Sequence, residues 1–283
     1  MSIAVVTDST SDLPPELAAE HGITVVPLNV HFGLDAFRDG IEMKADEFYR
    51  RLQTDRTFPT TSAPSSGTFA EIYRKLAAEH DGIISTHISS KVSATYSAAL
   101  QAADEVNAEG RVRVEVVDTL QASMALGLVA VGVAKTVKRG ASMDDAVQAA
   151  NSLAGRARFT GLVETLEYLQ RGGRIGKAQA LVGSLLRIKP ILALIDGEAH
   201  AVDRVRTRAR GIARIKQLVA EAAPLDALCV LYTTEPEMAE EMARDLSEHA
   251  PGGKPLIARL GPVVGTYLGP GMLGFGMISS ERR

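Results

Sequence analysis

The feature that most constrains the fold is a repeated change between two kinds of segment. Short apolar runs rich in β-branched residues recur along the 283-residue chain, and Ala-rich stretches that favour helix lie between several of them. The runs are residues 3–6, 23–28, 82–84, 112–117, 191–195, 227–232 and 255–260, and the helical stretches are 14–22, 67–82, 94–110 and 235–250. This alternation predicts an α/β fold with at least one mostly parallel sheet.

The length of the chain favours two domains over one. A new pattern begins in residues 151–169, which follow a helical stretch, so we place the boundary near residue 158. The sequence therefore predicts an N-terminal α/β domain of residues 1–158 and a C-terminal α/β domain of residues 159–283.

Composition excludes several classes of protein. The net charge is −3 and both signs are interspersed, which argues against a nucleic-acid-binding protein with a basic face. The single cysteine, Cys229, lies in an apolar run and cannot form an internal disulfide, which favours a reducing compartment. The sequence shows no signal peptide and no apolar stretch long enough to cross a bilayer, so we expect a cytoplasmic protein with no membrane span.

Hydroxyl side chains cluster directly after three predicted strands, in residues 7–14, 85–99 and 118–127. In a doubly wound sheet, ligands bind beyond the carboxyl ends of the strands. Each Ser or Thr, taken singly, is better explained as a helix cap or turn former. Three such loops at one edge of a sheet favour a shared ligand crevice instead. Residues 60–69, with six hydroxyls, are expected to form a loop that closes over this crevice.

Familiar motifs do not identify a cofactor. The segment RGGRIGKA lacks the phosphate-loop spacing, and GPGMLG matches a dinucleotide spacing with no room for the helix that should follow. No nucleophile elbow occurs, and the six histidines lack metal-ligand spacing. We therefore expect neither cofactor nor metal. Asp8 and Asp118 follow strands and are candidate bases, although capping a helix or holding loop amides is at least as good a role for an aspartate there. His87, in a hydroxyl-rich loop, is a third candidate base, but a hydrogen bond at the start of a helix is the better interpretation of it.

The second half of the chain carries a different signal. Arg171 and Arg174 flank two glycines, an arrangement that suits either a carboxylate or phosphate site or the solvated end of a helix. The apolar segment 180–194 that follows suits either a core or the wall of a hydrocarbon pocket.

Five stretches taken together resemble the DegV family of bacterial fatty-acid-binding proteins, which act with a fatty acid kinase. They are residues 5–14, 61–69, 88–99, 166–192 and 261–274, and they occur in the expected order over nearly the whole chain. The resemblance implies two α/β domains, the second with a mixed sheet, and a long-chain fatty acid at the domain junction. It also implies that the acyl chain lies in an apolar tunnel of the C-terminal domain.

The resemblance further implies which residues bind the carboxylate. Thr61 and Ser93 match the family's two carboxylate-binding positions, and we add five neighbours as candidate ligand-binding residues, namely Ser62, Thr95, Arg171, Thr266 and Tyr267. The chain departs from the family pattern at Ala63, Lys91 and Ala94. Tyr267 stands where relatives have a histidine near the carboxylate, and its hydroxyl is able to donate the same hydrogen bond. Arg206 is a further candidate contact for the carboxylate or the kinase.

In this family a partner kinase phosphorylates the bound carboxylate from ATP, which yields an acyl phosphate for phospholipid synthesis. The resemblance thus implies a non-catalytic carrier, with oligomeric state and preferred acyl chain unspecified. One alternative is an enzyme that acts on a small phosphorylated or hydroxylated metabolite, with Asp8 or His87 as its base. Another is a structural or regulatory binding module with an empty crevice.

Overall fold

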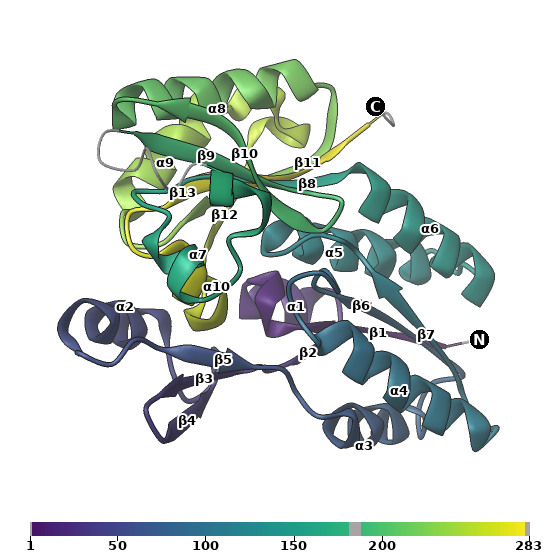
Figure 1. The fold of residues 1–283 in the computed structure, drawn as a ribbon. Coiled ribbons are helices and arrows are strands. Elements are labelled where there is room, and N and C mark those ends of the chain that lie inside the picture. The colour runs from purple at the N-terminus through teal and green to yellow at the C-terminus, as the bar shows by residue number, and fades with distance from the viewer. Residues whose placement is uncertain (1, 181–187, 281–283) are drawn as a thin grey trace.

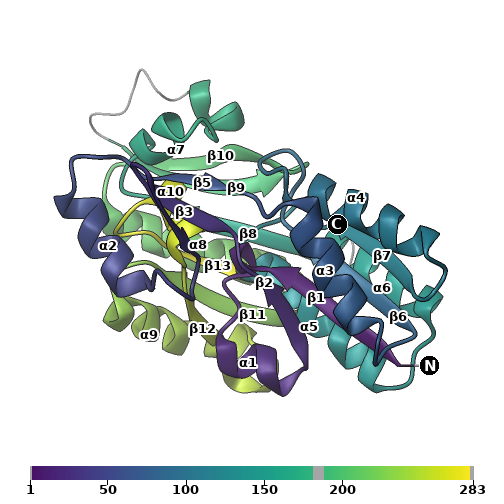
Figure 2. The same cartoon turned by 90° about the horizontal axis from the view of Figure 1, so that it is seen from below.

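The structure is a computed structural model that describes residues 2–180 and 188–280. Helices and strands alternate along most of the chain, and the strands form three sheets (Figures 1 and 2). The predicted α/β class, with one parallel and one mixed sheet, is confirmed.

The N-terminal sheet is entirely parallel and has the strand order β2-β1-β6-β7. Its strands are β1 Ile3–Asp8, β2 Ile23–Val26, β6 Gly82–His87 and β7 Arg113–Asp118. Each overlaps a run that the sequence predicts as a strand. Along β1, Ile3 and Val5 enter one hydrophobic cluster whereas Ala4 and Val6 enter another, because successive side chains of a strand point to opposite faces.

Helices therefore cover both faces of this sheet (Figure 1). Helices α3 (Ser66–Leu76) and α4 (Thr95–Ala108) pack on one face. The other face is covered by α1 (Pro15–Glu20), α5 (Met124–Lys138) and α6 (Met143–Arg156).

The second sheet is mixed and has the order β10-β9-β8-β13-β11-β12, in which β11 and β12 form the parallel pair. Its strands are β8 Ala157–Leu162, β9 Lys189–Ile195, β10 Glu198–Val205, β11 Leu225–Tyr232, β12 Leu256–Arg259 and β13 Leu273–Ser279. Helices α8 (Arg208–Ala222) and α9 (Pro236–Asp245) cover its outer face, and short 3-10 turns lie at Ser247–His249 and Pro251–Gly253.

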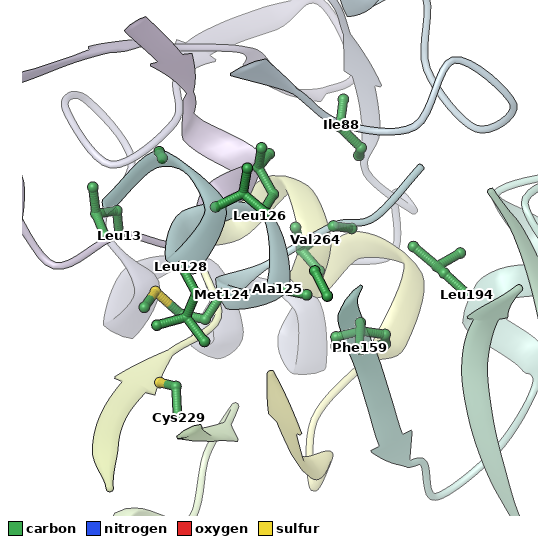
Figure 3. Packing of buried hydrophobic residues seen from close by; sticks show 14 of the residues in the cluster. Leu13, Ile88, Met124, Ala125, Leu126, Leu128, Phe159, Leu194, Cys229 and Val264 are labelled. Carbon is green, nitrogen blue, oxygen red and sulfur yellow. The ribbon is translucent and has the colours of Figure 1, made fainter. Parts of the chain in front are cut away.

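Helix α5 lies between the two large sheets and joins them into one core. Its first eight residues, 124–131, are all buried, as expected for a helix that is apolar on every side. Figure 3 shows Met124 and Leu128 of α5 close to Cys229 of β11. The boundary near residue 158 stays a prediction; β8, the first strand of the mixed sheet, begins at Ala157.

A third, small antiparallel sheet has the order β4-β3-β5 and projects beside helix α2 (Ala45–Thr54). It consists of β3 Asn29–Phe32, β4 Asp35–Arg38 and β5 Thr60–Ser62. The expectation of a loop over residues 60–69 is therefore wrong in part. Residues 60–62 pair with β3, and the side chain of Ser65 accepts a hydrogen bond from the Thr68 amide (3.1 Å) as the N-cap of α3. A three-residue strand is too short for its alternation to be recognised in the sequence.

Candidate functional site

The strand order of the parallel sheet creates a crevice at its carboxyl edge. The chain passes from β1 to β2 on one side, and then returns to the other side of β1 to form β6 and β7. Loops that leave β1 and β6 in opposite directions open a space between them, where α/β proteins bind ligands. The 3-10 turn η1 (Ser9–Ser11) follows β1, and the loop of residues 88–94 follows β6.

A cavity of about 160 Å³ lies where these loops meet the C-terminal half of the chain. The parallel-sheet loops contribute Thr10 and Ile88, whereas the inner face of the mixed sheet and helix α10 (Pro262–Leu268) contribute most of the apolar wall. Buried wall residues include Phe159, Leu192, Leu194, Val264 and Leu268. Figure 3 shows that Phe159, Leu194 and Val264 come from three different elements, β8, β9 and α10.

A group of polar side chains occurs on the more exposed part of the lining. The Thr61 Oγ1 and the Tyr267 hydroxyl lie 2.5 Å apart and share a hydrogen bond between β5 and α10. The Arg174 guanidinium lies over the Tyr267 ring, 5.3 Å from its centroid, and its Nε donates to the Val92 carbonyl (3.2 Å). Ser93, the residue after Val92, also lines the cavity, so Arg174 links the Tyr267 side chain to the loop that carries Ser93.

Exposure separates this polar group from the apolar wall. Thr61, Ser93 and Tyr267 are half-buried and Arg174 is exposed, whereas the wall residues named above are buried. The polar groups therefore lie toward the surface, and the apolar lining extends inward.

Ser93 is held in place by its own loop. Its Oγ accepts a hydrogen bond from the Thr95 amide (3.2 Å) and lies 2.8 Å from the Thr95 Oγ1, and its amide donates to the Ser89 carbonyl. Thr95 is fully buried at the start of α4 and does not line the cavity, so its contribution is to orient Ser93.

Three other candidate residues lie outside the cavity lining. Ser62 is exposed and its Oγ bonds the His31 Nε2 (2.9 Å). The Arg171 guanidinium stacks 4.1 Å from the Phe58 ring centroid at the end of helix α7 (Glu167–Arg171). The Thr266 hydroxyl donates to the Pro262 carbonyl within α10 (2.9 Å).

The candidate bases form a buried network. The Nδ1 of His87 bonds the Asp8 carboxylate (2.9 Å), and its Nε2 bonds the Ser85 hydroxyl (2.7 Å). Asp8 also accepts hydrogen bonds from the Thr10 and Ile88 amides, so it ties together two loops that line the cavity. Both Asp8 and His87 are fully buried and neither lines the cavity. Asp118 likewise accepts from loop amides, in keeping with the structural role considered for these residues.

Two polar residues of the lining, Thr10 and Arg174, are not among the ligand-binding residues predicted from the sequence, which chose Arg171 from the pair Arg171 and Arg174. Thr10 lies in a hydroxyl-rich loop that the sequence identified, but nothing distinguished it from its neighbours. Arg174 follows the helix end at Gly172, and Gly173 has φ +70°, so the turn rotates Arg174 toward Tyr267 and leaves Arg171 on the helix. The sequence shows both arginines beside the two glycines, but which of them faces the cavity depends on this left-handed turn at the helix end.

Two expectations concern the rest of the molecule. Within residues 2–180 and 188–280, no three His, Cys, Asp or Glu side chains gather in a way that would hold a metal ion. None of the helices in these ranges has both the length and the apolar character needed to cross a bilayer. Of the apolar segment 180–194, residues 181–187 lie outside the described residues, and residues 192–194 line the cavity.

A family model described as uncharacterised protein, DegV family, matches residues 2–280. The chain belongs to the DegV family. It is 42% identical over 277 residues to a DegV domain-containing protein of Streptomyces coelicolor, with 96% of each chain covered. It resembles a DegV family protein of Thermus thermophilus described as fatty acid binding, with a TM-score of 0.90, 36% identity, and 99% of this chain and 100% of that chain covered.

A third DegV relative, the fatty acid binding protein DegV of Bacillus subtilis, has a TM-score of 0.89 and 33% identity, with 99% of this chain and 100% of that chain covered. These matches cover both sheets and the junction between them. The family resemblance and the fold predicted from the sequence are therefore confirmed.

Proposed function

We propose that this protein is a carrier that binds one long-chain fatty acid at the junction of its two halves. The observation that carries the proposal is the division of one cavity into a buried apolar wall and a half-buried group of hydroxyls with an arginine. A fatty acid has the same division, with an apolar tail and a charged head. The fatty acid binding described for the Thermus and Bacillus relatives supports this assignment.

The head group is assigned to the polar end. A carboxylate that leaves water requires charge-assisted hydrogen bonds to offset its desolvation. The hydroxyls of Thr61, Ser93 and Tyr267 are able to donate such bonds, and Arg174 supplies a positive charge. We therefore propose these four residues as the head-group site. Thr95 supports it indirectly through Ser93, and the positions of Ser62, Arg171 and Thr266 favour structural roles.

The acyl tail is assigned to the apolar wall. Each buried methylene contributes ~0.8 kcal/mol, so a sixteen-carbon tail contributes on the order of 10 kcal/mol before the costs of binding are subtracted. The cavity of about 160 Å³ is smaller than the roughly 300–1,000 Å³ of typical small-molecule sites. A long tail therefore requires side chains of the wall to move apart, and the dependence of affinity on chain length measures how far they do.

We further propose that the bound acid is presented to a separate fatty acid kinase, and that this protein is not itself the catalyst of phosphoryl transfer. The family motifs of residues 61–69 and 88–99 support this role. So does the exposure of Arg174 and Ala94 at the polar end, because a carboxylate near the surface is accessible to a partner enzyme. Delivery for phospholipid synthesis and a cytoplasmic location belong to the same proposal.

The alternative of a small-metabolite enzyme has less support. It requires a polar pocket with Asp8 or His87 facing the substrate, whereas both side chains are buried beside each other outside an apolar cavity.

Mass spectrometry of solvent extracts tests the carrier proposal directly. The purified protein should release about one long-chain fatty acid per chain, or should bind one when it is added. Thr61→Ala combined with Ser93→Ala should lower kinase-dependent formation of acyl phosphate while the circular dichroism spectrum stays unchanged. Empty preparations that also fail to bind added fatty acids would refute the proposal, as would turnover of a metabolite by the isolated protein.

A further inference from the structure

A second cavity, of about 740 Å³, lies on the other side of the start of helix α10. Gly261 and Pro262 line this second cavity, whereas the next residue, Val263, lines the first. The turn η1 is shared in the same way, with Ser9 facing the second cavity and Thr10 facing the first. The two cavities are thus separate spaces that share α10 and η1. The volume of the second is within the roughly 300–1,000 Å³ of small-molecule sites.

Two buried carboxylates, Asp12 and Asp39, line the second cavity. Both lie beside Gly261: a Cβ on that glycine would be 3.2 Å from the Oδ1 of each aspartate and 3.7 Å from the Oδ2 of Asp39. Asp12 accepts hydrogen bonds from the Gly261 amide (2.8 Å) and the Ser123 hydroxyl (2.6 Å). The glycine therefore leaves room for two carboxylates to face one space.

Within residues 2–180 and 188–280, these two carboxyl groups are buried with no cation bonded to them. Asp39 is only 4% exposed, and its Oδ1 has no hydrogen-bond partner in the part of the chain that the structure describes. In the same residues neither Asp12 nor Asp39 forms an ion pair. Burial raises the pKa of Asp39 to about 7, with the Ser9 hydroxyl and the Val263 amide acting in the opposite direction, and burial also raises the pKa of Asp12. A buried acid pair of this kind is stabilised by a cation.

The two cations among the lining residues, Lys44 and Arg259, form no ion pair with Asp12 or Asp39. The Lys44 ammonium donates to the Gly40 carbonyl, and Arg259 donates to the Thr233 carbonyl and pairs with Asp46. In the described ranges no third His, Cys, Asp or Glu side chain joins the two carboxylates to form a metal-binding group. The remaining wall is largely apolar and includes Leu13, Ile23, Val25 and Ile257. This combination suits a cation carried on an apolar body.

We propose that the second cavity binds an organic ammonium ion, with its charged nitrogen at Asp12 and Asp39 and its hydrocarbon part against the apolar wall. The ligand enters independently of the fatty acid, because it occupies a different space. Since a carboxylate shares its charge between both oxygens, the nitrogen is attracted to the pair even where one oxygen lies below the cavity surface.

Three probes of similar size and different charge test the proposal on the full-length protein loaded with fatty acid. They are n-pentylammonium, neutral 1-pentanol and anionic pentanoate, each titrated while methyl resonances are followed by NMR. The ammonium should bind at least about tenfold more tightly than the alcohol, as expected for hydrogen bonds to a charged group. The shifts should occur at Ile23, Val25 and Ile257.

Asp39→Asn should remove the preference for the ammonium, and Asp35→Asn, an exposed residue on the same hairpin, should retain it. Asp12→Asn provides a second test if Asp39→Asn does not fold. The proposal is overturned if the wild type binds ammonium and alcohol equally, if the preference survives in Asp39→Asn, or if the shifts occur at Leu192 and Leu194 of the first cavity. Because fatty acid binding is measured separately through the first cavity, failure here leaves the carrier proposal unaffected.

Discussion

Removal of the Tyr267 hydroxyl is the sharpest perturbation of the proposed head-group site. In the structure this hydroxyl and Thr61 Oγ1 bond each other at 2.5 Å, so one of the two protons is used between them. When a carboxylate binds, both hydroxyls are able to turn and donate to it. Binding therefore replaces one neutral hydrogen bond with two charge-assisted ones.

The cost of Tyr267→Phe follows from this exchange. The variant loses one hydrogen bond to the carboxylate, worth about 1.5–3 kcal/mol. It also has no Thr61–Tyr267 hydrogen bond to break when the ligand binds, and this offsets about 0.5–1.5 kcal/mol of the loss. The net loss is about 1–2 kcal/mol, a decrease of about 5- to 30-fold in affinity. The apolar tail still supplies most of the binding, so the variant should bind weakly rather than not at all.

The assay compares palmitate with hexadecanol by displacement of a fluorescent fatty acid. Both ligands have the same tail, so the ratio of their affinities reports the head-group site. That ratio should decrease in Tyr267→Phe and in Thr61→Val. Ser62→Ala is the matched control, because Ser62 adjoins Thr61 on β5 but bonds His31 outside the cavity. An unchanged ratio in Tyr267→Phe, or an equal decrease in Ser62→Ala, would show that Tyr267 does not bind the carboxylate.

Three further predictions test the wall, the arginine and the buried acid. Affinity for saturated fatty acids should rise by up to about fourfold per added methylene and then level off. Ala199→Phe places a larger side chain in the cavity wall and should therefore move this plateau to shorter acyl chains. An affinity that does not depend on acyl-chain length would contradict an apolar tunnel. Arg174→Gln should lower the palmitate-to-hexadecanol ratio more than Arg171→Gln, and the opposite order would place the head group at Phe58 instead. Because the pKa of Asp39 is about 7 in the fold and near 4 when unfolded, the folded state loses stability as pH rises from 4 to 7 and not above it. The free energy of unfolding of Asp39→Asn, measured with urea, should therefore increase relative to that of the wild type by up to about 4 kcal/mol between pH 4 and 8. Parallel pH profiles of this free energy in the two proteins would contradict the raised pKa of Asp39.

Much of the scaffold follows from local sequence. The four parallel strands each carry a compact β-branched run, and helices α1, α4 and α5 each end two residues before a glycine, so these elements are recognisable one at a time. Strands β8 and β13 were not predicted from the sequence, because glycines interrupt their apolar runs, at Gly161 in β8 and at Gly274 and Gly276 in β13. At Gly274 a Cβ would lie 2.2 Å from the Thr160 carbonyl oxygen, so close packing with the neighbouring strand, and not strand propensity, determines the residue there.

The candidate site could be predicted as a region but not residue by residue. Hydroxyl-rich loops after parallel strands indicate a crevice, and the cavity is found there. Which hydroxyls face it depends on contacts between distant segments: Thr61 meets Tyr267 across 206 residues of chain, and Ser62, its neighbour, points elsewhere. The family resemblance directed attention to Thr61 and Ser93, and the placement of Arg174 required the turn at Gly173.

A crystal structure of the protein with palmitate would show directly whether one cavity holds both head and tail. We expect elongated density in the first cavity, with the carboxylate within hydrogen-bond distance of Thr61, Ser93 and Tyr267 and the tail against Phe159 and Leu194. Density with the carboxylate at Leu194 and the tail toward Tyr267, or fatty acid bound only outside this cavity, would contradict this expectation.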